Sequence, residues 1–185
     1  MNFNPFPTIE TKNLLLRRMV ESDRNDIHEM RKDPQMNEYT DSKEDENVSE
    51  TTAYIEKMSK GIEQNKWIIW AIEHKLTQKV IGSISIWNIN VELKSGELGY
   101  GIIPSFQGKG LMKEALQNVV KYGFNEMKLK EIVAFTEENN IASLRLLEKC
   151  QFLQIDRMEE DGYFKKQVFQ MNVYQLKNNT ISANS

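Results

Sequence analysis

The residues most suited to chemistry form a short turn at the start of a predicted helix: Gly108, Lys109 and Gly110. The first turn of a helix presents backbone N–H groups without intrahelical partners, together with the positive end of the peptide dipoles. Glycines at this point let an anion approach the backbone closely, and Lys109 adds a full positive charge. The turn therefore favours a phosphate ligand, although a glycine-rich connection without any ligand fits the same residues.

Two common phosphate-binding motifs do not fit this turn. A P-loop requires a glycine five residues before Gly108, where this chain has Ile103, and a Ser or Thr after the lysine, where it has Gly110. The dinucleotide fingerprint GxGxxG also fails, because Lys113 occupies the position of its third glycine. The turn on its own therefore does not identify the phosphate compound.

The turn is predicted to connect a strand to a helix that faces the core. Residues 95–103 read as a strand that ends at Pro104, which has no N–H to donate. From residue 110 onward the apolar residues recur at the helical spacing, which predicts a helix over residues 110–126.

The rest of the chain alternates between strand and helix patterns. Strands are predicted at residues 13–19, 67–73, 79–90, 95–103, 131–136 and 163–176, and helices at residues 22–33, 53–58, 110–126 and 140–150. Residues 40–52 read as an exposed connection, and residues 177–185 as a disordered tail. Because the chain has no internal repeat and no break in composition, we expect one α/β domain over residues 1–176.

Composition excludes several classes of function. The 185 residues are 39% hydrophobic and 28% charged, which is enough for one buried core. The formal net charge is −3 with both signs interspersed, so a nucleic-acid partner is not expected. No targeting segment and no membrane-spanning run are seen, so we expect a cytoplasmic protein. Cys150 is the single cysteine and His28 and His74 lie far apart, so neither a disulfide nor a metal site is expected.

Three separated segments together resemble the GNAT superfamily of N-acetyltransferases, in particular the branch that acetylates the N-termini of ribosomal proteins. The segments are IETKNLLLRRM near the start, ELGYGIIPSFQGKGLMKEAL in the middle and ENNIASLRLLEKCQF toward the end. Met112 and Gln151 depart from the family pattern, which has Gly or Ala at the first position and Gly at the second. The resemblance covers most of the chain.

The resemblance implies an α/β (α+β) fold with a mixed, mostly antiparallel twisted sheet, flanking helices and a splayed central strand pair. It implies that the pantetheine of acetyl-CoA fills the splay as an added strand would, and that the pyrophosphate lies at the glycine turn. A backbone N–H of Ile102 or Ile103 would then contact the thioester carbonyl. The implied cofactor-binding residues are Ile102, Ile103, Gln107, Gly108, Lys109, Gly110, Leu111, Met112 and Asn140.

Two catalytic residues follow from the resemblance together with the strand pattern. Glu97 is the predicted base, and strand alternation places it on the face of Gly99 and Gly101, where missing side chains would leave room for a ligand. Ser143 is the predicted acid, because the tyrosine that many relatives use is Leu147 here. A solvent-facing carboxylate and a hydroxyl bonded to its own helix are the alternatives.

Two functions remain open at this point. One is acetyl transfer from acetyl-CoA to a primary amine, either a protein N-terminus or a small amine such as a polyamine or an antibiotic. The other is a GNAT-fold module that binds acyl-CoA without turnover, suggested by Leu147 and Ile155, which stand where relatives have an acid and a base. The sequence leaves the oligomeric state open, including a homo-oligomer.

Overall fold

A computed structural model describes residues 1–179. Its centre is an eight-stranded sheet in the order β1-β2-β3-β4-β5-β6-β8-β7, in which only the β5–β6 pair is parallel. The strands are β1 Ile9–Glu10, β2 Leu14–Arg17, β3 Ile68–His74, β4 Lys79–Asn90, β5 Ser95–Ile102, β6 Glu131–Glu137, β7 Leu153–Asp161 and β8 Val168–Lys177. The helices are α1 Arg24–Lys32, α2 Val48–Glu63, α3 Leu111–Asn125 and α4 Ile141–Lys149, with 3-10 turns at Glu21–Asp23 and Pro104–Phe106.

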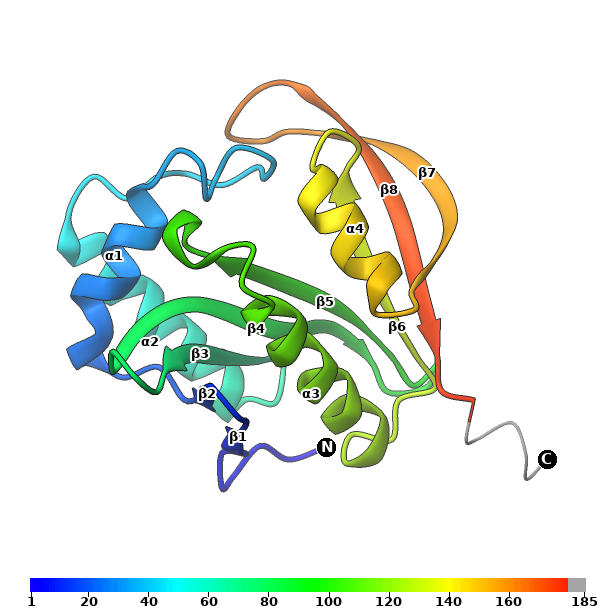
Figure 1. Cartoon of the computed structure of the whole chain (residues 1–185), viewed down its shortest axis with the longest axis horizontal. Coiled ribbons are helices and arrows are strands. Elements are labelled where there is room, and N and C mark those ends of the chain that lie inside the picture. The colour runs from blue at the N-terminus through cyan, green and yellow to red at the C-terminus, as the bar shows by residue number, and fades with distance from the viewer. Residues whose placement is uncertain (180–185) are drawn as a thin grey trace.

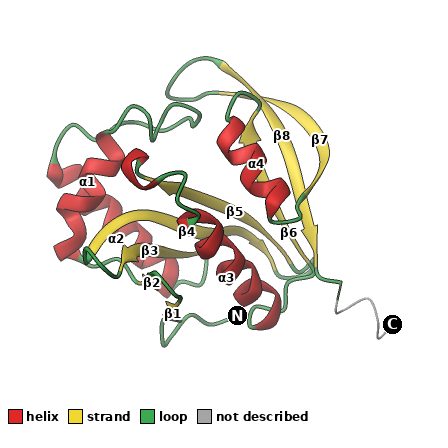
Figure 2. Ribbon diagram, in the orientation of Figure 1, coloured by secondary structure: helices red, strands yellow, loops and turns green. Residues whose placement is uncertain are grey.

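Helices cover both faces of the sheet (Figures 1 and 2). α3 and α4 lie on one face, where Tyr122 of α3 packs edge-on against Trp70 of β3 with ring centroids 5.4 Å apart. α1 and α2 lie on the other, and α1 is fixed by the Val80 N–H, which donates to the Asp26 carboxylate at 3.0 Å. The predicted mixed, mostly antiparallel sheet with flanking helices is confirmed.

The core explains why α3 packs tightly against the sheet. Trp70 is fully buried, and a Cβ at Gly123 of α3 would lie 3.0 Å from Ile132 and 3.1 Å from Ile86. The absence of a side chain at Gly123 therefore lets the helix approach β4 and β6 closely. Burial of apolar surface contributes about 25 cal/mol per Å² to stability, and Leu111 at the start of α3 is buried as well, so the helix is anchored to the sheet at both ends.

The parallel pair β5–β6 is joined at one end only. Ser95, Gly96 and Glu97 pair with Glu131, Ile132 and Val133, and the pairing stops there although both strands continue. Figure 1 shows the two strands diverging beyond this point, so that β5 follows β4 while β6 follows β8. The predicted splayed strand pair is confirmed, with Glu97 at its closed end.

Two predicted elements begin at the wrong residue. α2 begins at Val48 instead of 53, because the Asn47 side chain caps it by accepting the Glu50 N–H at 3.2 Å. The strand predicted over residues 163–176 begins later, at Val168 of β8, and β7, which pairs with it and ends at Asp161, was not predicted. Every residue of β7 is exposed, so it shows no alternation of buried and exposed positions.

The predicted disordered tail begins too early. Lys177 is the last residue of β8, and the Asn178 N–H donates to the Lys130 carbonyl at 2.8 Å. The remainder of that prediction, from residue 180, lies outside the described residues. Within residues 1–179 no helix has the length and apolar character needed to cross a membrane.

Candidate active site

The glycine turn has a backbone suited to an anion. Gly108 and Gly110 have φ of 72° and 77°, in the left-handed region that favours glycine, and no atom lies within 4 Å of where their Cβ atoms would stand. The first hydrogen bond of α3 runs from Glu114 N–H to Gly110 C=O at 3.0 Å, and no side chain caps the helix. The N–H groups of the first turn therefore remain available for an oxygen ligand.

The side chains around this turn are held by local contacts. The Lys109 ammonium lies 4.9 Å from the centre of the Phe106 ring, and Phe106 packs edge-on against His74. Gln107 Nε2 donates to the Ile102 carbonyl at 3.0 Å, which links the turn to the end of β5. Leu111 is buried and Met112 is partly buried, so these two residues contribute backbone rather than exposed side chains.

The free edge of β5 lies beside the opening between β5 and β6. Ile103 N–H donates to the Ile81 carbonyl of β4 at 2.8 Å, so it is not available for a thioester carbonyl. That part of the prediction for Ile103 is wrong. Backbone groups alternate sides along a strand, so the amides of Leu98, Tyr100 and Ile102 face the opening, and Ile102 remains the candidate donor.

The N-terminus of α4 lies on the other side of this opening. Asn140 is its N-cap, and its side-chain oxygen accepts the Ser143 N–H at 3.1 Å. This contact gives Asn140 a role in capping the helix, beside the predicted cofactor role. The Ser143 hydroxyl lies 2.6 Å from the Tyr100 hydroxyl of β5. Leu147 is completely buried, so the position where many relatives have a tyrosine here belongs to the core.

Glu97 has the surroundings of a tunable carboxyl group. Asn88, in a left-handed conformation at the bulge of β4, donates from Nδ2 to Glu97 Oε2 at 3.1 Å. Burial raises the pKa of Glu97 above its ordinary value; the Asn88 hydrogen bond partly offsets this, and the charge of Glu160 on β7 adds to it. A raised pKa makes a carboxylate a better proton acceptor near neutral pH.

The face of β5 beyond Glu97 is less open than predicted. A Cβ at Gly101 would lie 3.2 Å from Met36, and one at Gly99 would lie 2.9 Å from the Ser85 hydroxyl. Side chains of the neighbouring elements therefore use much of the space that the two glycines leave. That a ligand lies beside the two glycines stays a prediction, and Met36 and Ser85 are the side chains it would contact there.

The connection between α1 and α2 is hydrogen-bonded to the turn between β7 and β8. We call this contact, formed by Asn37 and Asp41 with residues 163–165, the clasp. The Asp41 carboxylate accepts the backbone N–H groups of Tyr163, Phe164 and Lys165 at 2.6, 3.0 and 2.9 Å. Lys165 Nζ returns a hydrogen bond to the Asn37 carbonyl. Figure 1 shows the α1–α2 connection and the β7–β8 turn meeting at the top of the view. The backbone of residues 163–165 is therefore fixed by one carboxylate.

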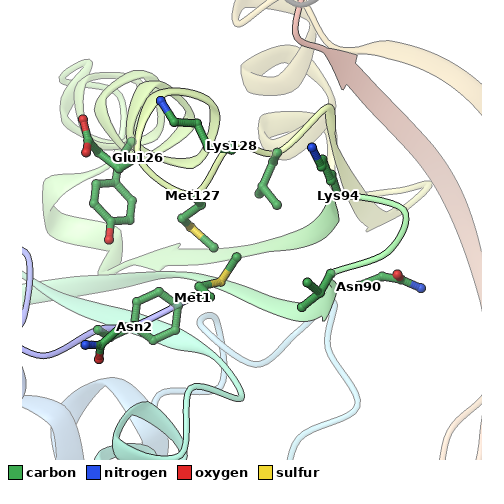
Figure 3. Close-up of a pocket in the computed structure, with 11 residues that line it drawn as sticks. Met1, Asn2, Asn90, Lys94, Glu126, Met127 and Lys128 are labelled. Carbon is green, nitrogen blue, oxygen red and sulfur yellow. The ribbon is translucent and has the colours of Figure 1, made fainter.

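A cavity of about 280 Å³ lies elsewhere, at the C-terminal end of α3. Figure 3 shows Met1 and Met127 facing each other across it, with Lys94 and Lys128 near its edge. α3 has 15 residues, and a helix rises about 1.5 Å per residue, so the cavity lies about 20 Å from the glycine turn. It is therefore separate from the glycine turn.

The sequence prediction missed three side chains around the opening, Tyr100, Glu160 and Asn88, and it also missed Asp41 of the clasp. Tyr100 could have been noticed, because strand alternation places it on the face opposite Glu97. Glu160 could not, since β7 itself was not predicted. No local pattern relates Asp41 to residues more than 120 positions away.

The splayed strands, the anion-binding turn and a partly buried carboxyl group define the class of protein. Such an opening accommodates an extended chain between strands while the turn holds its phosphates. The sequence profile of the acetyltransferase (GNAT) domain family matches residues 13–153. The chain therefore belongs to the GNAT family and is an N-acetyltransferase.

One relative is similar to the chain in sequence and two solved structures are similar in fold. The chain is 28% identical over 171 residues to the uncharacterized N-acetyltransferase YoaA of Bacillus subtilis, covering 92% of this chain and 97% of the relative. Its fold is similar to that of the ribosomal-protein-S5-alanine acetyltransferase of Vibrio fischeri, with a TM-score of 0.82, 20% identity and coverage of 94% and 97%. It is also similar to the spermidine N-acetyltransferase of Vibrio cholerae in complex with CoA and spermine, with a TM-score of 0.78, 22% identity and coverage of 90% and 96%.

Proposed function

We propose that the protein transfers the acetyl group of acetyl-CoA to a cationic primary amine, with a protein N-terminal α-amine as the first candidate. The observation that carries the proposal is the opening between β5 and β6, which has an anion-binding turn at one side and Glu97 at its closed end. The fold similarity to a ribosomal-protein acetyltransferase supports the choice of acceptor.

The residues present fit acetyl-CoA. The amides after Gly108 and Gly110 would hold the pyrophosphate, and Lys109 would turn from Phe106 toward its charge. The free amides of β5 would pair with the pantetheine, as in strand addition. Gln107 would have to release the Ile102 carbonyl for that group to take part. When bound, acetyl-CoA supplies an activated acetyl group at the opening.

The side chains around the opening would carry the protons. Glu97 takes a proton from the attacking amine, directly or through a water molecule, because its raised pKa suits that task. A β5 amide such as that of Ile102 stabilises the negative charge that develops on the carbonyl oxygen. Ser143 donates a hydrogen bond to the leaving sulfur.

A small polyamine is the second candidate acceptor. The paired negative charges of Glu97 and Glu160 favour a substrate with more than one positive charge, and one structural neighbour contains spermine. A polyamine and an N-terminal peptide differ in salt dependence, because the attraction of several charges is screened strongly by salt.

The test is thiol release from acetyl-CoA with N-terminal peptides, polyamines and aminoglycosides as acceptors. We expect release that depends on the acceptor, together with mass-spectrometric detection of the N-acetyl product. Binding of acetyl-CoA without acceptor-dependent release from any member of the panel would contradict the proposal and favour a non-catalytic acyl-CoA-binding module.

A further inference from the structure

Two hydroxyl groups from different elements meet at the opening. Tyr100 lies on β5, three residues beyond the last β5–β6 pair, and Ser143 lies in the first turn of α4. Their oxygen atoms are 2.6 Å apart, which is short for a hydrogen bond between hydroxyl groups. Because Asn140 already holds the Ser143 N–H, the position of the serine on the helix is fixed from its backbone side.

The direction of this hydrogen bond follows from chemistry. Burial raises the pKa of Tyr100 to about 12, opposed by the Ser143 hydrogen bond and aided by Cys150 and Tyr174. The phenol therefore keeps its proton at neutral pH. A phenol is more acidic than an aliphatic alcohol, so it is the better donor of the two. Tyr100 then donates, the Ser143 oxygen accepts, and the proton of Ser143 remains free for another acceptor.

We propose that Tyr100 is a positioning residue, which donates to Ser143 Oγ and thereby directs the Ser143 proton into the opening between β5 and β6. This inference rests on the proposed acetyl transfer. A hydroxyl group that accepts one hydrogen bond is also a stronger donor of the next. The Tyr100 hydroxyl group itself does not contact the substrate.

The protons and electrons balance in this scheme. The amine nitrogen forms the C–N bond while the C–S bond breaks, and the electron pair of the C–S bond stays on sulfur. The amine proton passes to Glu97 and then to solvent. The departing thiolate is stabilised by the hydrogen bond from Ser143 and takes its proton from solvent, so Ser143 and Tyr100 keep their protons throughout.

A purely structural role is the alternative, and the chain contains a matched example of one. Tyr174 of β8 donates to Glu148 of α4 at 3.2 Å, which also joins a strand to α4 through a phenol. Tyr174→Phe therefore removes a strand-to-helix hydrogen bond of the same kind and leaves the hydrogen bond between Tyr100 and Ser143 in place. It serves as the control.

The experiment is a double-mutant cycle of Tyr100→Phe and Ser143→Ala, with Tyr174→Phe alongside. Turnover is measured by thiol release in water and in D₂O, CoA affinity by calorimetry and folding by thermal unfolding. We expect Tyr100→Phe to lower kcat about tenfold, to leave CoA affinity unchanged and to reduce the solvent isotope effect. In the Ser143→Ala background the same change should have no further effect, and Tyr174→Phe should retain the wild-type kcat.

Equal losses from Tyr100→Phe with and without the Ser143 hydroxyl group would overturn the inference, as would an unchanged kcat. A wild-type protein without turnover would contradict the proposed function instead, so the two failures are distinguishable. If Tyr100→Phe does not fold, 3-fluorotyrosine at position 100 replaces it, since this residue keeps the ring and is a stronger donor. It should raise kcat only when Ser143 is present, and an unchanged kcat would contradict the role of Tyr100.

Discussion

The cofactor side and the reacting side of the opening are built differently. The proposed pyrophosphate site consists of backbone groups from one contiguous segment, Gln107 to Met112, at the start of α3. The reacting side combines Glu97 and Tyr100 of β5 with Ser143 of α4 and Glu160 of β7. A binding site made of local backbone survives most changes of side chain, whereas the reacting side depends on how distant elements pack together.

The largest expected effect is on the cofactor side. Gly108→Val with Gly110→Val places branched side chains at left-handed φ, which costs about 1–2 kcal/mol per residue, and fills the space before the α3 amides. We expect CoA affinity to fall about a hundredfold, measured by calorimetry. Lys109→Ala, which leaves the turn intact, should lose less than about tenfold. Unchanged affinity in a folded double variant would remove this turn from the site.

Removing the clasp should affect the reacting side although Asp41 is not part of it. Asp41→Ala frees residues 163–165, so the acceptor KM should rise about tenfold while the KM for acetyl-CoA stays constant. Asp156→Ala on the exposed strand β7 is the control.

Hydrogen bonds from Lys165, Tyr163 and Phe164 lower the pKa of Asp41 despite partial desolvation. The clasp should therefore hold above the ordinary carboxyl pKa and weaken as pH falls through the lowered value. An acceptor KM that Asp41→Ala leaves unchanged would separate the clasp from the site.

A stability effect is expected where α3 contacts the first hairpin. Glu114 accepts hydrogen bonds from Thr11 and Asn13 at 2.6 to 2.8 Å. Burial alone would raise the pKa of Glu114, but these contacts outweigh it and lower the pKa. Glu114→Ala should reduce the free energy of unfolding by about 1–3 kcal/mol in urea denaturation. The exposed Gln117→Ala should not, and equal stability of both variants would refute the role of Glu114.

The smallest expected effect concerns the stability cost of Glu97. The pKa of Glu97 is raised in the folded protein. The contribution of Glu97 to folding stability is therefore most favourable at pH values below its pKa in the unfolded chain, and it is lost as the pH rises through its pKa in the folded protein. Glu97→Gln removes the charged form and should raise Tm slightly at pH 7, with the difference vanishing near pH 4. A lower Tm at pH 7 would show that ionised Glu97 stabilises the fold.

The contrast between a site made of one contiguous segment and a site made of distant elements also explains what the sequence could predict. α3 and its turn were placed to within a residue, because glycine, lysine and helical periodicity are local signals. The boundaries of β4 were also correct, since its apolar and β-branched residues form one continuous run. The pairing of Tyr100 with Ser143 was not predictable, because it depends on the packing of α4 against β5. β7 was missed because an exposed edge strand with many charges has no buried face to reveal it.

The most direct test of the account is the pH dependence of kcat/KM for the wild type and for Glu97→Gln. For the wild type, log(kcat/KM) plotted against pH should have a slope of one between the pKa of Glu97 and the pKa of the amine. Below the pKa of Glu97 the slope should be two. Glu97→Gln should be about a hundredfold slower at neutral pH, should keep a slope of one throughout and should bind CoA normally. A variant with the wild-type rate and the wild-type profile would contradict the assignment of Glu97 as the base.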